Sequence, residues 1–525
     1  MNMDFDAIVV GGGLAGLTSA AYLCRYGYRT LLCEKAHKTG GLVNTFWHKG
    51  YAFDAGIRAL ENSGIVFPML KTLGLEIEFL QNPVSIGIAE KWTRLQSRES
   101  MQGYANMLAG FFPENAANID RIVLEIKKVM DYMDVLYGID NPLFLEDRKD
   151  KQYLLTTLLP WLLKYQVNIR KANRLNQPVN SYLKRFTNNK ALSDMIAQHF
   201  FKDTPTFFAL SYFGLYLDYF YPKGGTGTLA QTVTDSIYRA GGEILTDTTV
   251  TRVDTNTRQL QTNGGDVYPY KKLVWAADQK TLYQAANATR TQQAGKQRDL
   301  VEKGQGGDSI LTLFMGVHLT KDYFEIRCGA HAFYTPCVSG LSLLPDWNEA
   351  ASTEGGLYEW IRQYLERTTY EISCPALRDA ALAPEGKTGV IVSTLMDYRL
   401  VKKIWDTGKY DQFKAFCIQT VTKVLETSVF PGITEKIEFT LCATPMTIER
   451  ETGNAHGAIT GWAFTNNPLP SENRFQKILG SIDTPMADVY QCGQWTFSPS
   501  GLPVSILTGK LAADEINKAL KGTAT

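Results

Sequence analysis

The 525-residue sequence has almost no net charge and few histidines, and each of these features makes certain classes of function improbable. It carries 54 Lys and Arg against 53 Asp and Glu, so the formal net charge is +1. A chain this close to neutral gives no electrostatic reason to expect a nucleic acid or an acidic partner. The 6 His are scattered, and no H-x-x-x-H or C-x-x-C spacing occurs. The sequence therefore predicts no metal site and no nucleic-acid partner.

Long apolar runs are also missing. No stretch of about eighteen uncharged apolar residues occurs, so no segment is predicted to span a membrane. The first apolar run begins almost at once, at Ala7, which leaves no room for a signal peptide. Several of the 8 Cys lie inside apolar patterns, where a thiol behaves as a small hydrophobic group. This favours a reducing compartment over a disulfide framework, and we expect a cytoplasmic protein.

What the chain does have is the composition of a large globular protein. Hydrophobic residues make up 44% and charged residues 20% of the sequence. A chain of 525 residues is too long for one ordinary core, so two or more domains are expected.

The chain is organised around a glycine-rich turn near its start. Residues 7–10 form a short apolar run that suits a strand buried on both faces. Residues 11–16 read G-x-G-x-x-G, and apolar residues then recur at helical spacing until Tyr26. A second strand is predicted over residues 29–33, and Glu34 ends it.

Each glycine of this turn has a task in binding a dinucleotide. Gly11 allows the tight turn, Gly13 lets the backbone approach a pyrophosphate, and Gly16 lets the helix lie close to the strand. The helix N-terminus, beginning with Leu14 and Ala15, offers unpaired N–H groups and a positive dipole end to the phosphates.

The acid after the second strand adds to this interpretation. Glu34 lies eighteen residues beyond Gly16, where it can accept hydrogen bonds from both ribose hydroxyls and repel a 2′-phosphate. A glycine-rich turn alone could be a strand–turn–helix that binds nothing. With a strand before it, a helix after it and an acid at this spacing, the sequence favours dinucleotide binding.

Two more glycine-containing segments follow. Lys35 opens a loop that reaches Gly40, Gly41 and Leu42, and the paired glycines let a backbone pass close to a flat or charged group. The run Y-A-F-D-A-G at residues 51–56 alternates small and aromatic residues and ends in a glycine.

From about Val84 to Asp218 glycine becomes scarce and helical periodicity dominates. Pro113 and Glu114 open a predicted helix with one apolar face. We expect a helical cap that packs on the rest of the protein.

Residues 154–167 within this region are unusually rich in Leu, Trp and Tyr. The cations that flank them are Lys149, Lys151, Lys164, Arg170 and Lys171. An apolar patch with a cationic rim suits an interfacial segment that contacts a membrane, and ordinary core packing fits nearly as well.

Residues 207–221 are dense in aromatic side chains. Such a stripe is usually core, and it could also line a long apolar channel.

A second glycine-rich run lies at residues 221–229, and the helix predicted after it ends at Gly241 and Gly242. Strands are predicted at 243–245 and 250–253. A second nucleotide site is the rival interpretation. We reject it because no strand is predicted before these glycines and the third glycine of the fingerprint is absent.

The last two hundred or so residues predict a mixed sheet and a closing helix. Strands are expected at 310–317 and 390–396, and helices at 358–367 and 410–427. Near the end, a strand at 488–493 leads through a loop into a helix at 504–519, whose N-terminus could face a phosphate or a flavin.

Several segments, in order along the chain, carry a family resemblance. The run P-x-G-G-x-x-x-L at 222–229, with the later G-G and V-x-x-V, resembles the return to the FAD domain in the amine-oxidase and phytoene-desaturase superfamily, and residues 493–503 resemble that superfamily's final flavin-contacting motif. E-x5-G-G from Glu34 and F-D-x-G at 53–56 resemble the FAD-binding start of the amine-oxidase and phytoene-desaturase superfamily. Residues 373–387 are similar to the S-x-P-x-x-x-D-x-x-L-A-P-x-G-K run of carotenoid desaturases and isomerases. Residues 443–462 resemble the carotenoid-isomerase and retinol-saturase branch.

The resemblance implies FAD as the cofactor. The residues expected to contact it lie in the opening turn, the acid and its following loop, and the middle and closing segments: Gly11, Gly13, Leu14, Ala15, Gly16, Glu34, Lys35, Gly40, Gly41, Leu42, Val250, Gly493, Gln494, Leu502 and Pro503. Gln494 stands where the family often has Asp, and Leu42 stands where many relatives have Arg. An amide can still hydrogen-bond a ribityl hydroxyl or a pyrophosphate oxygen, so FAD binding is expected to survive.

The predicted fold class is α/β. A Rossmann-type FAD-binding domain is built from the discontinuous segments 1–83, 221–305 and 461–525. Residues 84–220 form the helical cap and the first part of a substrate domain, and residues 306–460 form its mixed-sheet second part.

The resemblance also implies an activity at a C–C bond of a long apolar polyene or isoprenoid, such as a carotenoid or retinoid. Desaturation, saturation and cis/trans isomerisation all fit, and no second nucleotide fingerprint points to a dedicated NAD(P)H domain. A flavin amine oxidase and a non-catalytic isoprenoid carrier are the alternatives. Arg58, Glu449 and His456 are candidates for a catalytic acid or base, and a structural role is the favoured interpretation of each. The sequence leaves the substrate, the direction of electron flow and the oligomeric state open.

Overall fold

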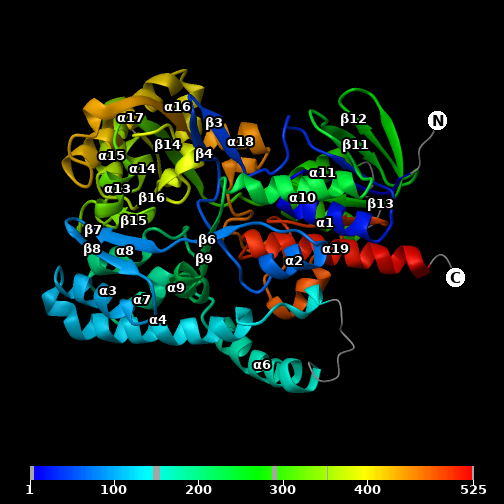
Figure 1. Ribbon diagram of the computed structural model, residues 1–525, viewed down its shortest axis with the longest axis horizontal. Coiled ribbons are helices and arrows are strands. Elements are labelled where there is room, and N and C mark those ends of the chain that lie inside the picture. The colour runs from blue at the N-terminus through cyan, green and yellow to red at the C-terminus, as the bar shows by residue number, and fades with distance from the viewer. Residues whose placement is uncertain (1–4, 146–153, 287–291, 352, 523–525) are drawn as a thin grey trace.

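The computed structural model describes residues 5–145, 154–286, 292–351 and 353–522 (Figure 1). Two seven-stranded sheets lie toward opposite ends of its long axis, and a helical layer lies beside the second sheet. The predicted α/β architecture is therefore confirmed.

The first sheet has the strand order β10-β2-β1-β13-β12-β11, and β19 pairs with β13 beside this path. Its strands are β1 (Phe5–Val10), β2 (Thr30–Cys33), β10 (Glu243–Leu245), β11 (Val250–Asp254), β12 (Gln259–Thr262), β13 (Val267–Trp275) and β19 (Val489–Gln491). The strands β10, β2, β1, β13 and β19 are parallel, whereas β11 and β12 form an antiparallel meander with β13. Strands from three distant parts of the chain thus make one sheet, as predicted for a discontinuous Rossmann-type domain.

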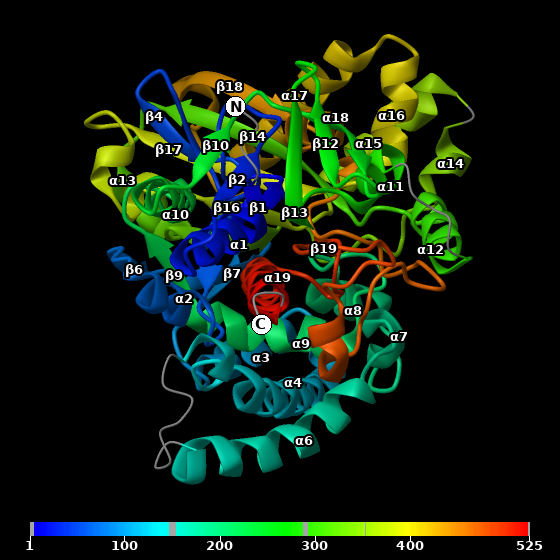
Figure 2. The same ribbon diagram turned by 90° about the vertical axis from the view of Figure 1, so that its right-hand side faces the viewer.

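The strands of this sheet present apolar side chains to both faces, and helices pack on one of these faces. The covering helices are α1 (Leu14–Arg25), α2 (Val66–Leu73), α10 (Gly227–Arg239) and α19 (Leu502–Gly522). Figures 1 and 2 show α1 and α19 side by side. Their backbones approach closely at Gly509, where a methyl group would lie 2.4 Å from the carbonyl oxygen of Ala15.

The second sheet has the order β18-β14-β17-β16-β15-β7-β8. Its strands are β7 (Val84–Ile88), β8 (Lys91–Leu95), β14 (Ser309–Val317), β15 (His331–Thr335), β16 (Tyr370–Ser373), β17 (Thr388–Met396) and β18 (Ile437–Ala443). Alternate residues of these strands, such as Leu313 and Val392, pack under α13 (Lys321–Arg327), α15 (Glu354–Leu365), α16 (Tyr398–Asp406) and α17 (Tyr410–Thr427). The residues between them face the other way, and they include the polar row described below.

The start of the region predicted to be helical, residues 84–95, is not helical, because β7 and β8 pair with each other and β7 pairs with β15 in the second sheet. The helical layer begins after these strands. Its helices are α3 (Ser100–Ala109), α4 (Ala116–Tyr137), α6 (Leu159–Asn173), α7 (Val179–Leu183), α8 (Lys190–Ala197) and α9 (Thr206–Leu215). The apolar face of α4 is buried as expected. Pro113 does not open α4 itself, because residues Pro113–Asn115 form a separate 3-10 turn before it.

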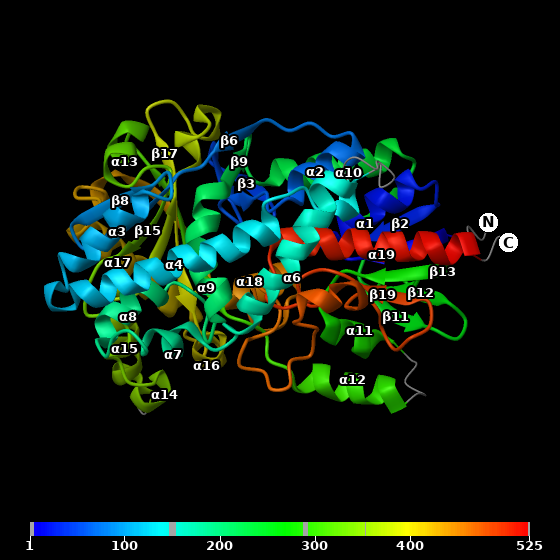
Figure 3. The same ribbon diagram turned by 90° about the horizontal axis from the view of Figure 1, so that it is seen from below.

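The segment 154–167 lies at the edge of the molecule. A π-helical turn (Leu154–Leu158) leads directly into α6. Figures 2 and 3 show α6 beyond α4 on the outer side of the helical layer. Lys149 and Lys151, which were expected to flank this segment, lie outside the described residues.

One expectation about the middle glycine-rich run is wrong. A strand does precede these glycines, because β9 (Tyr219–Pro222) ends just before Lys223. It is antiparallel to β5 (Leu60–Glu61) and β6 (Phe79–Gln81) in a separate three-stranded sheet. The strand before these glycines is therefore not the parallel strand of a βαβ unit, and this pairing and the missing glycine disfavour a second nucleotide site.

The smaller elements connect these layers. They are the hairpin β3 (Thr45–His48) and β4 (Tyr51–Asp54), and the helices α11 (Gln279–Ala285), α12 (Gln292–Lys303), α14 (Trp347–Ala350) and α18 (Pro445–Thr452). In the described part of the chain no helix is long and apolar enough to cross a membrane. The domain boundaries at residues 83, 220, 305 and 460 stay a prediction.

Candidate functional site

The carboxyl edge of the first sheet collects the predicted cofactor residues. β1 and β13 are in parallel register, with Val10 opposite Trp275, and β19 continues this alignment with Gln491 opposite Trp275. The chain therefore leaves all three strands at one edge, where ligands bind in open α/β sheets.

The opening turn leaves room for a ligand at Gly13 and nowhere else among its fingerprint glycines. A methyl group at Gly16 would lie 2.0 Å from the carbonyl oxygen of Gly11, and one at Gly11 would lie 2.9 Å from that of Ala276. A methyl group at Gly13 would have no atom within 4 Å. Gly11 and Gly16 thus close the turn, and Gly13 exposes backbone beside the first residues of α1, Leu14 and Ala15. This open backbone fits the pyrophosphate of a dinucleotide.

Glu34 lies against the same turn. Its Oε2 accepts a hydrogen bond from the Gly12 amide at 2.5 Å, and its Oε1 accepts one from the Ala36 amide at 2.8 Å. The carbonyl oxygen of Glu34 accepts a hydrogen bond from Thr248, which brings the chain leading into Val250 alongside. The carboxylate and the start of β11 thus lie together at this edge. Lys35 points elsewhere, because its Nζ donates to the carbonyl oxygen of Arg450.

The loop with the paired glycines packs on the opening turn. The Gly40 amide donates to the carbonyl oxygen of Gly12 at 2.8 Å. A methyl group at Gly41 would lie 3.4 Å from the Cα of Gly13. Both glycines have positive φ, 114° at Gly40 and 55° at Gly41. Leu42 then accepts a hydrogen bond from the amide of Ile57, which joins this loop to residues 55–58.

The closing segment meets the opening turn as well. Gly493 has a φ of 96°, and a methyl group there would lie 3.2 Å from the Cβ of Ala15. The carbonyl oxygen of Gln494 packs against Gly461. Leu502 and Pro503 begin α19. All three predicted cofactor segments are thus in contact around one edge of the sheet.

The middle segment is joined to this edge by a buried carboxylate that the sequence analysis did not single out. Asp54 is fully buried at the end of β4. It accepts hydrogen bonds from the hydroxyls of Thr45, Thr226 and Tyr221 and from the Thr226 amide, at 2.8–2.9 Å. The aspartate of the F-D-x-G run therefore ties the middle glycine-rich run to the hairpin.

Arg58 is also buried, against the second sheet. Its Nη1 donates to the carbonyl oxygens of Asp54 and Gly56 at 2.6 and 2.5 Å, and its Nη2 donates to the Ser393 hydroxyl at 2.9 Å. Burial lowers its pKa. These three hydrogen bonds give Arg58 a structural role. Its positive charge also lowers the pKa of Glu371.

A polar row crosses the inner face of the second sheet. Pairing across the strands puts Thr312 opposite Ser393, Ser393 opposite Glu371, and Glu371 opposite Phe333. Glu371 keeps 31% of its side-chain surface accessible. Glu371 is the ionisable residue of this row.

A chain of hydrogen bonds holds that charge. Arg378 donates to the Asn82 side-chain oxygen at 2.8 Å, the Asn82 amide lies 2.8 Å from His331 Nδ1, and His331 Nε2 lies 2.9 Å from Glu371 Oε1. The bond from Arg378 fixes the amide of Asn82 as a donor, so His331 accepts at Nδ1 and donates at Nε2.

The pKa values of this pair agree with that assignment. Burial lowers the pKa of His331 and keeps the imidazole neutral, although Glu371 acts in the opposite sense. Burial acts to raise the pKa of Glu371, but the bond from His331 and the charges of Arg58 and Arg378 outweigh it and lower the pKa. Glu371 is therefore an ionised carboxylate.

The other two catalytic candidates lie in a different cluster. Glu449 accepts a hydrogen bond from the Tyr398 hydroxyl at 2.9 Å and one from the His456 amide at 3.1 Å. His456 Nδ1 accepts a hydrogen bond from the Gly306 amide at 2.9 Å, and burial lowers its pKa. These contacts hold the turn after α18, so the geometry fits the structural role that the sequence favoured.

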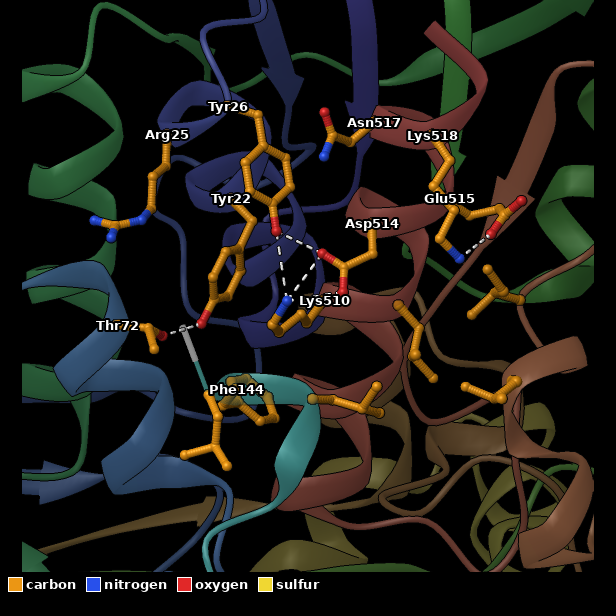
Figure 4. Close-up of a pocket in the computed structure, with 15 residues that line it drawn as sticks. Tyr22, Arg25, Tyr26, Thr72, Phe144, Lys510, Asp514, Glu515, Asn517 and Lys518 are labelled. Carbon is orange, nitrogen blue, oxygen red and sulfur yellow. Dashed lines mark hydrogen bonds and ion pairs between the residues drawn. The ribbon is translucent and has the colours of Figure 1, made fainter. Parts of the chain in front are cut away.

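A groove of about 610 Å³ lies away from this edge (Figure 4). It runs along the C-terminal halves of α1 and α19, whereas the predicted cofactor residues lie at their first turns. Lys510 pairs with Asp514 at 2.8 Å, and the Tyr26 hydroxyl donates to the same carboxylate at 2.5 Å. Lys510, Asp514 and Tyr26 thus satisfy one another within the groove. Among the described residues, no cluster of His, Cys, Asp and Glu could hold a metal ion.

Sequence reasoning missed Asp54, His331 and Glu371. Asp54 belongs to the F-D-x-G run, which was interpreted only as a family resemblance. An acid in an apolar strand also predicts a buried carboxyl group with hydrogen-bond partners. Glu371 alternates with Tyr370 and Ile372, which marks a charged residue on one face of a strand. His331 gave no signal, because its partners come from distant strands.

Comparison with known proteins places this fold in one class, the flavoproteins with an α/β fold. The family model of flavin containing amine oxidoreductases matches residues 14–301. The chain belongs to this family, and membership implies FAD as the cofactor.

The relatives that align over nearly the whole chain are more specific. An all-trans-retinol 13,14-reductase of Danio rerio is 24% identical over 94% of this chain and 82% of its own length. A prolycopene isomerase of an Oncidium hybrid cultivar is 21% identical over 98% of this chain and 84% of its own length. Among solved structures, a double mutant of putrescine oxidase superposes with a TM-score of 0.62 at 12% identity, covering 98% of this chain and 99% of that one. The last similarity shows the fold alone.

Proposed function

We propose that this protein is an FAD-dependent oxidoreductase that acts on a C–C bond of a long apolar polyene or isoprenoid, by desaturation, saturation or cis/trans isomerisation. The observation that carries the proposal is the end-to-end similarity to two relatives named for all-trans-retinol and prolycopene, both of them polyenes.

The residues that would hold FAD follow from the geometry of the edge. The open backbone of Gly13 and the first turn of α1 would bind the pyrophosphate, Glu34 would accept the ribose hydroxyls, and the bend before α19 at Gly501 would meet the isoalloxazine ring. When bound, the flavin supplies the hydride chemistry. The protein supplies position, electrostatics and exclusion of water.

Aromatic side chains beside the second sheet support an apolar substrate. Tyr216 lies 5.1 Å from Phe333 between ring centroids, and Tyr219 stacks on His331 at 5.7 Å. Phe208 and Tyr212 of α9 stay partly exposed next to this cluster. A polyene presents a long flat apolar surface, and such rings bury it without unpaired polar groups.

A flavin amine oxidase is the second candidate. Glu371 favours it, because an ionised carboxylate on a partly accessible side chain could bind a substrate ammonium group. Arg58 and Arg378, which act on the same carboxylate, disfavour it.

The test is to purify the protein, extract and identify its flavin, and incubate oxidised and reduced protein in parallel with phytoene, lycopene isomers, all-trans-retinol and putrescine. We expect FAD and a change in the absorption spectrum of at least one polyene. Peroxide release with putrescine and no polyene product would instead identify an amine oxidase. A protein that binds a polyene but neither changes it nor exchanges electrons with it would be a carrier.

We also propose that the protein is cytoplasmic and contacts a membrane surface through α6. The exposed apolar residues of this segment lie on one helical face: Leu155, Leu159, Leu162, Leu163 and Val167, each between 40% and 67% exposed. The exposed cations Lys164, Arg170 and Lys171 accompany them. An apolar face with basic neighbours fits an anionic bilayer surface, where apolar substrates dissolve.

A further inference from the structure

Glu61 is a further acid beside the candidate site. It is the last residue of β5 and pairs with Tyr219 of β9. Its Oε1 lies 3.7 Å from the position of a methyl group at Gly501, the residue directly before α19. The carboxyl group therefore lies at the closing bend, where the isoalloxazine ring is proposed to bind.

The surroundings of Glu61 give its carboxylate no cation. In the described part of the chain, no other residue donates a hydrogen bond to it. The charged neighbour that acts on it is Asp218, and Tyr219 is the other titratable group beside it. The bend at residues 500–503 contributes no ionisable side chain. Burial raises the pKa of Glu61 to about 7, and the like charge of Asp218 adds to this.

Glu371 is the opposite case on the other side of Tyr219. The ring of Tyr219 stacks on His331, which bonds Glu371, while its backbone pairs with Glu61. Glu371 is held ionised by His331, Arg58 and Arg378, so it has no proton to give near neutral pH. In enzyme active sites, two carboxyl groups whose surroundings shift their pKa values in opposite directions commonly serve as a proton donor and a fixed negative charge.

We propose that Glu61 is the catalytic acid–base residue of this site, exchanging a proton with one carbon of the substrate double bond. The inference rests on the proposed function. The O–H bond of Glu61 breaks and its electron pair stays on oxygen, while the π pair of the double bond forms the new C–H bond. The neighbouring carbon is left one electron pair short.

Two outcomes complete the reaction with balanced atoms and electrons. In isomerisation, rotation about the new single bond is followed by return of a proton to the Glu61 carboxylate, which restores the double bond. In saturation, a hydride completes the second carbon, and the donor is a reduced flavin. Desaturation is the reverse, with Glu61 as the base.

The experiment compares wild type with Glu61→Gln, which keeps the shape and removes the ionisable group. Infrared difference spectra of the flavin-loaded protein without substrate are recorded across a pH series. We expect the carboxylic-acid C=O band of wild type to disappear with a midpoint near pH 7, and this change to be missing in Glu61→Gln. Glu76→Gln, at an exposed glutamate of the same segment, is the matched control and keeps it.

Turnover of the accepted polyene is then measured with the same variants. We expect kcat of Glu61→Gln to fall by about a hundredfold or more, with loss of the corresponding step in the pH profile and of deuterium uptake from D₂O. If Glu61→Gln keeps the infrared change, or turns over as fast as wild type, the inference is overturned. If wild type shows the infrared change but alters no polyene, the proposed function fails instead, and proton transfer to carbon fails with it.

Discussion

At the scale of single residues, buried acids organise this protein, and Asp54 is the clearest example. Its carboxylate accepts hydrogen bonds from Tyr221 and Thr226 of the middle segment and from Thr45 within the hairpin. A fully buried charge is tolerated only with such partners, because desolvation costs several kcal/mol otherwise. The F-D-x-G run is thus explained by packing as well as by resemblance.

Asp54→Ala should destabilise the protein severely. It leaves three buried hydroxyls and one amide without their acceptor, which we expect to lower the free energy of unfolding by about 3 kcal/mol or more. Chemical denaturation monitored by circular dichroism measures the change. The control is Asp411→Asn, whose side chain is 92% exposed beside Lys414 and which should cost less than about 1 kcal/mol. Equal stability of the two variants would contradict the role given to Asp54.

Glu61 makes the stability of the protein depend on pH in a predictable direction. Its pKa is about 7 in the folded chain and 4.5 in the unfolded chain, so the folded chain binds more protons between these values. The stability contributed by Glu61 is therefore full below about pH 4.5 and falls as the pH rises toward about 7. Glu61→Gln removes this loss.

Thermal unfolding of the two proteins at about pH 5 and about pH 8.5 checks the sign. We expect the difference in Tm, Glu61→Gln minus wild type, to be larger and more positive at the higher pH. A difference that shrinks as the pH rises would mean that the Glu61 carboxylate has a stabilising partner in solution.

At the scale of elements, the turn between β1 and α1 separates glycines needed for folding from one needed for binding. A methyl group at Gly16 or Gly11 would meet a backbone carbonyl oxygen within 3 Å, whereas Gly13 has φ −67° and ψ 170° and faces open space. Any residue adopts these angles, so the glycine at position 13 serves the ligand and not the fold.

Gly13→Ala should therefore fold normally and bind FAD poorly. The methyl group takes the space that the pyrophosphate needs, and we expect the Kd for FAD to rise at least about tenfold, a loss of about 1.4 kcal/mol. Fluorescence titration of the apoprotein measures it, with circular dichroism to show an unchanged fold. Gly295→Ala, which also meets open space but lies in α12, is the control and should bind FAD as wild type does. Unchanged affinity in Gly13→Ala would show that the cofactor lies elsewhere.

The exposed face of α6 gives a prediction about surfaces. The double change Leu159→Glu and Leu163→Glu places two charges on a face with 51% and 67% exposure, so folding should be spared. Sedimentation with vesicles that contain anionic lipid should show at least about a tenfold loss of binding, because the apolar contact is removed. Leu124→Glu, at an isolated leucine of α4 that is 65% exposed, should bind as wild type does. Equal binding by all three proteins would exclude α6 as the contact.

At the scale of the whole molecule, the sequence predicted those parts of the fold that depend on residues close together in the chain. The opening strand, turn, helix and acid are contiguous, so residues 7–34 could be assigned without knowing the rest of the chain. The closing helix is also local, since its start at Leu502 follows a loop rich in Ser, Gly and Pro.

The polar row on the second sheet could not be predicted in the same way. Thr312, Ser393, Glu371 and Phe333 come together only through the register of four strands, and a shift of one residue would turn each side chain to the other face. The strand at 219–222 was missed because its tyrosines and phenylalanine read as part of the aromatic helical stretch before it. Tertiary pairing with β5 and β6 makes it a strand.

The central claim is that the three predicted segments hold a single FAD at the carboxyl edge of the first sheet, with its ring toward the second sheet. A crystal structure of the purified, flavin-loaded protein tests this most directly. The account predicts one FAD per chain, with its pyrophosphate over Gly13, a ribose at Glu34 and its isoalloxazine ring beside Gly501 and Glu61. A flavin bound instead in the groove between the C-terminal halves of α1 and α19, or a protein that binds no flavin, would contradict it.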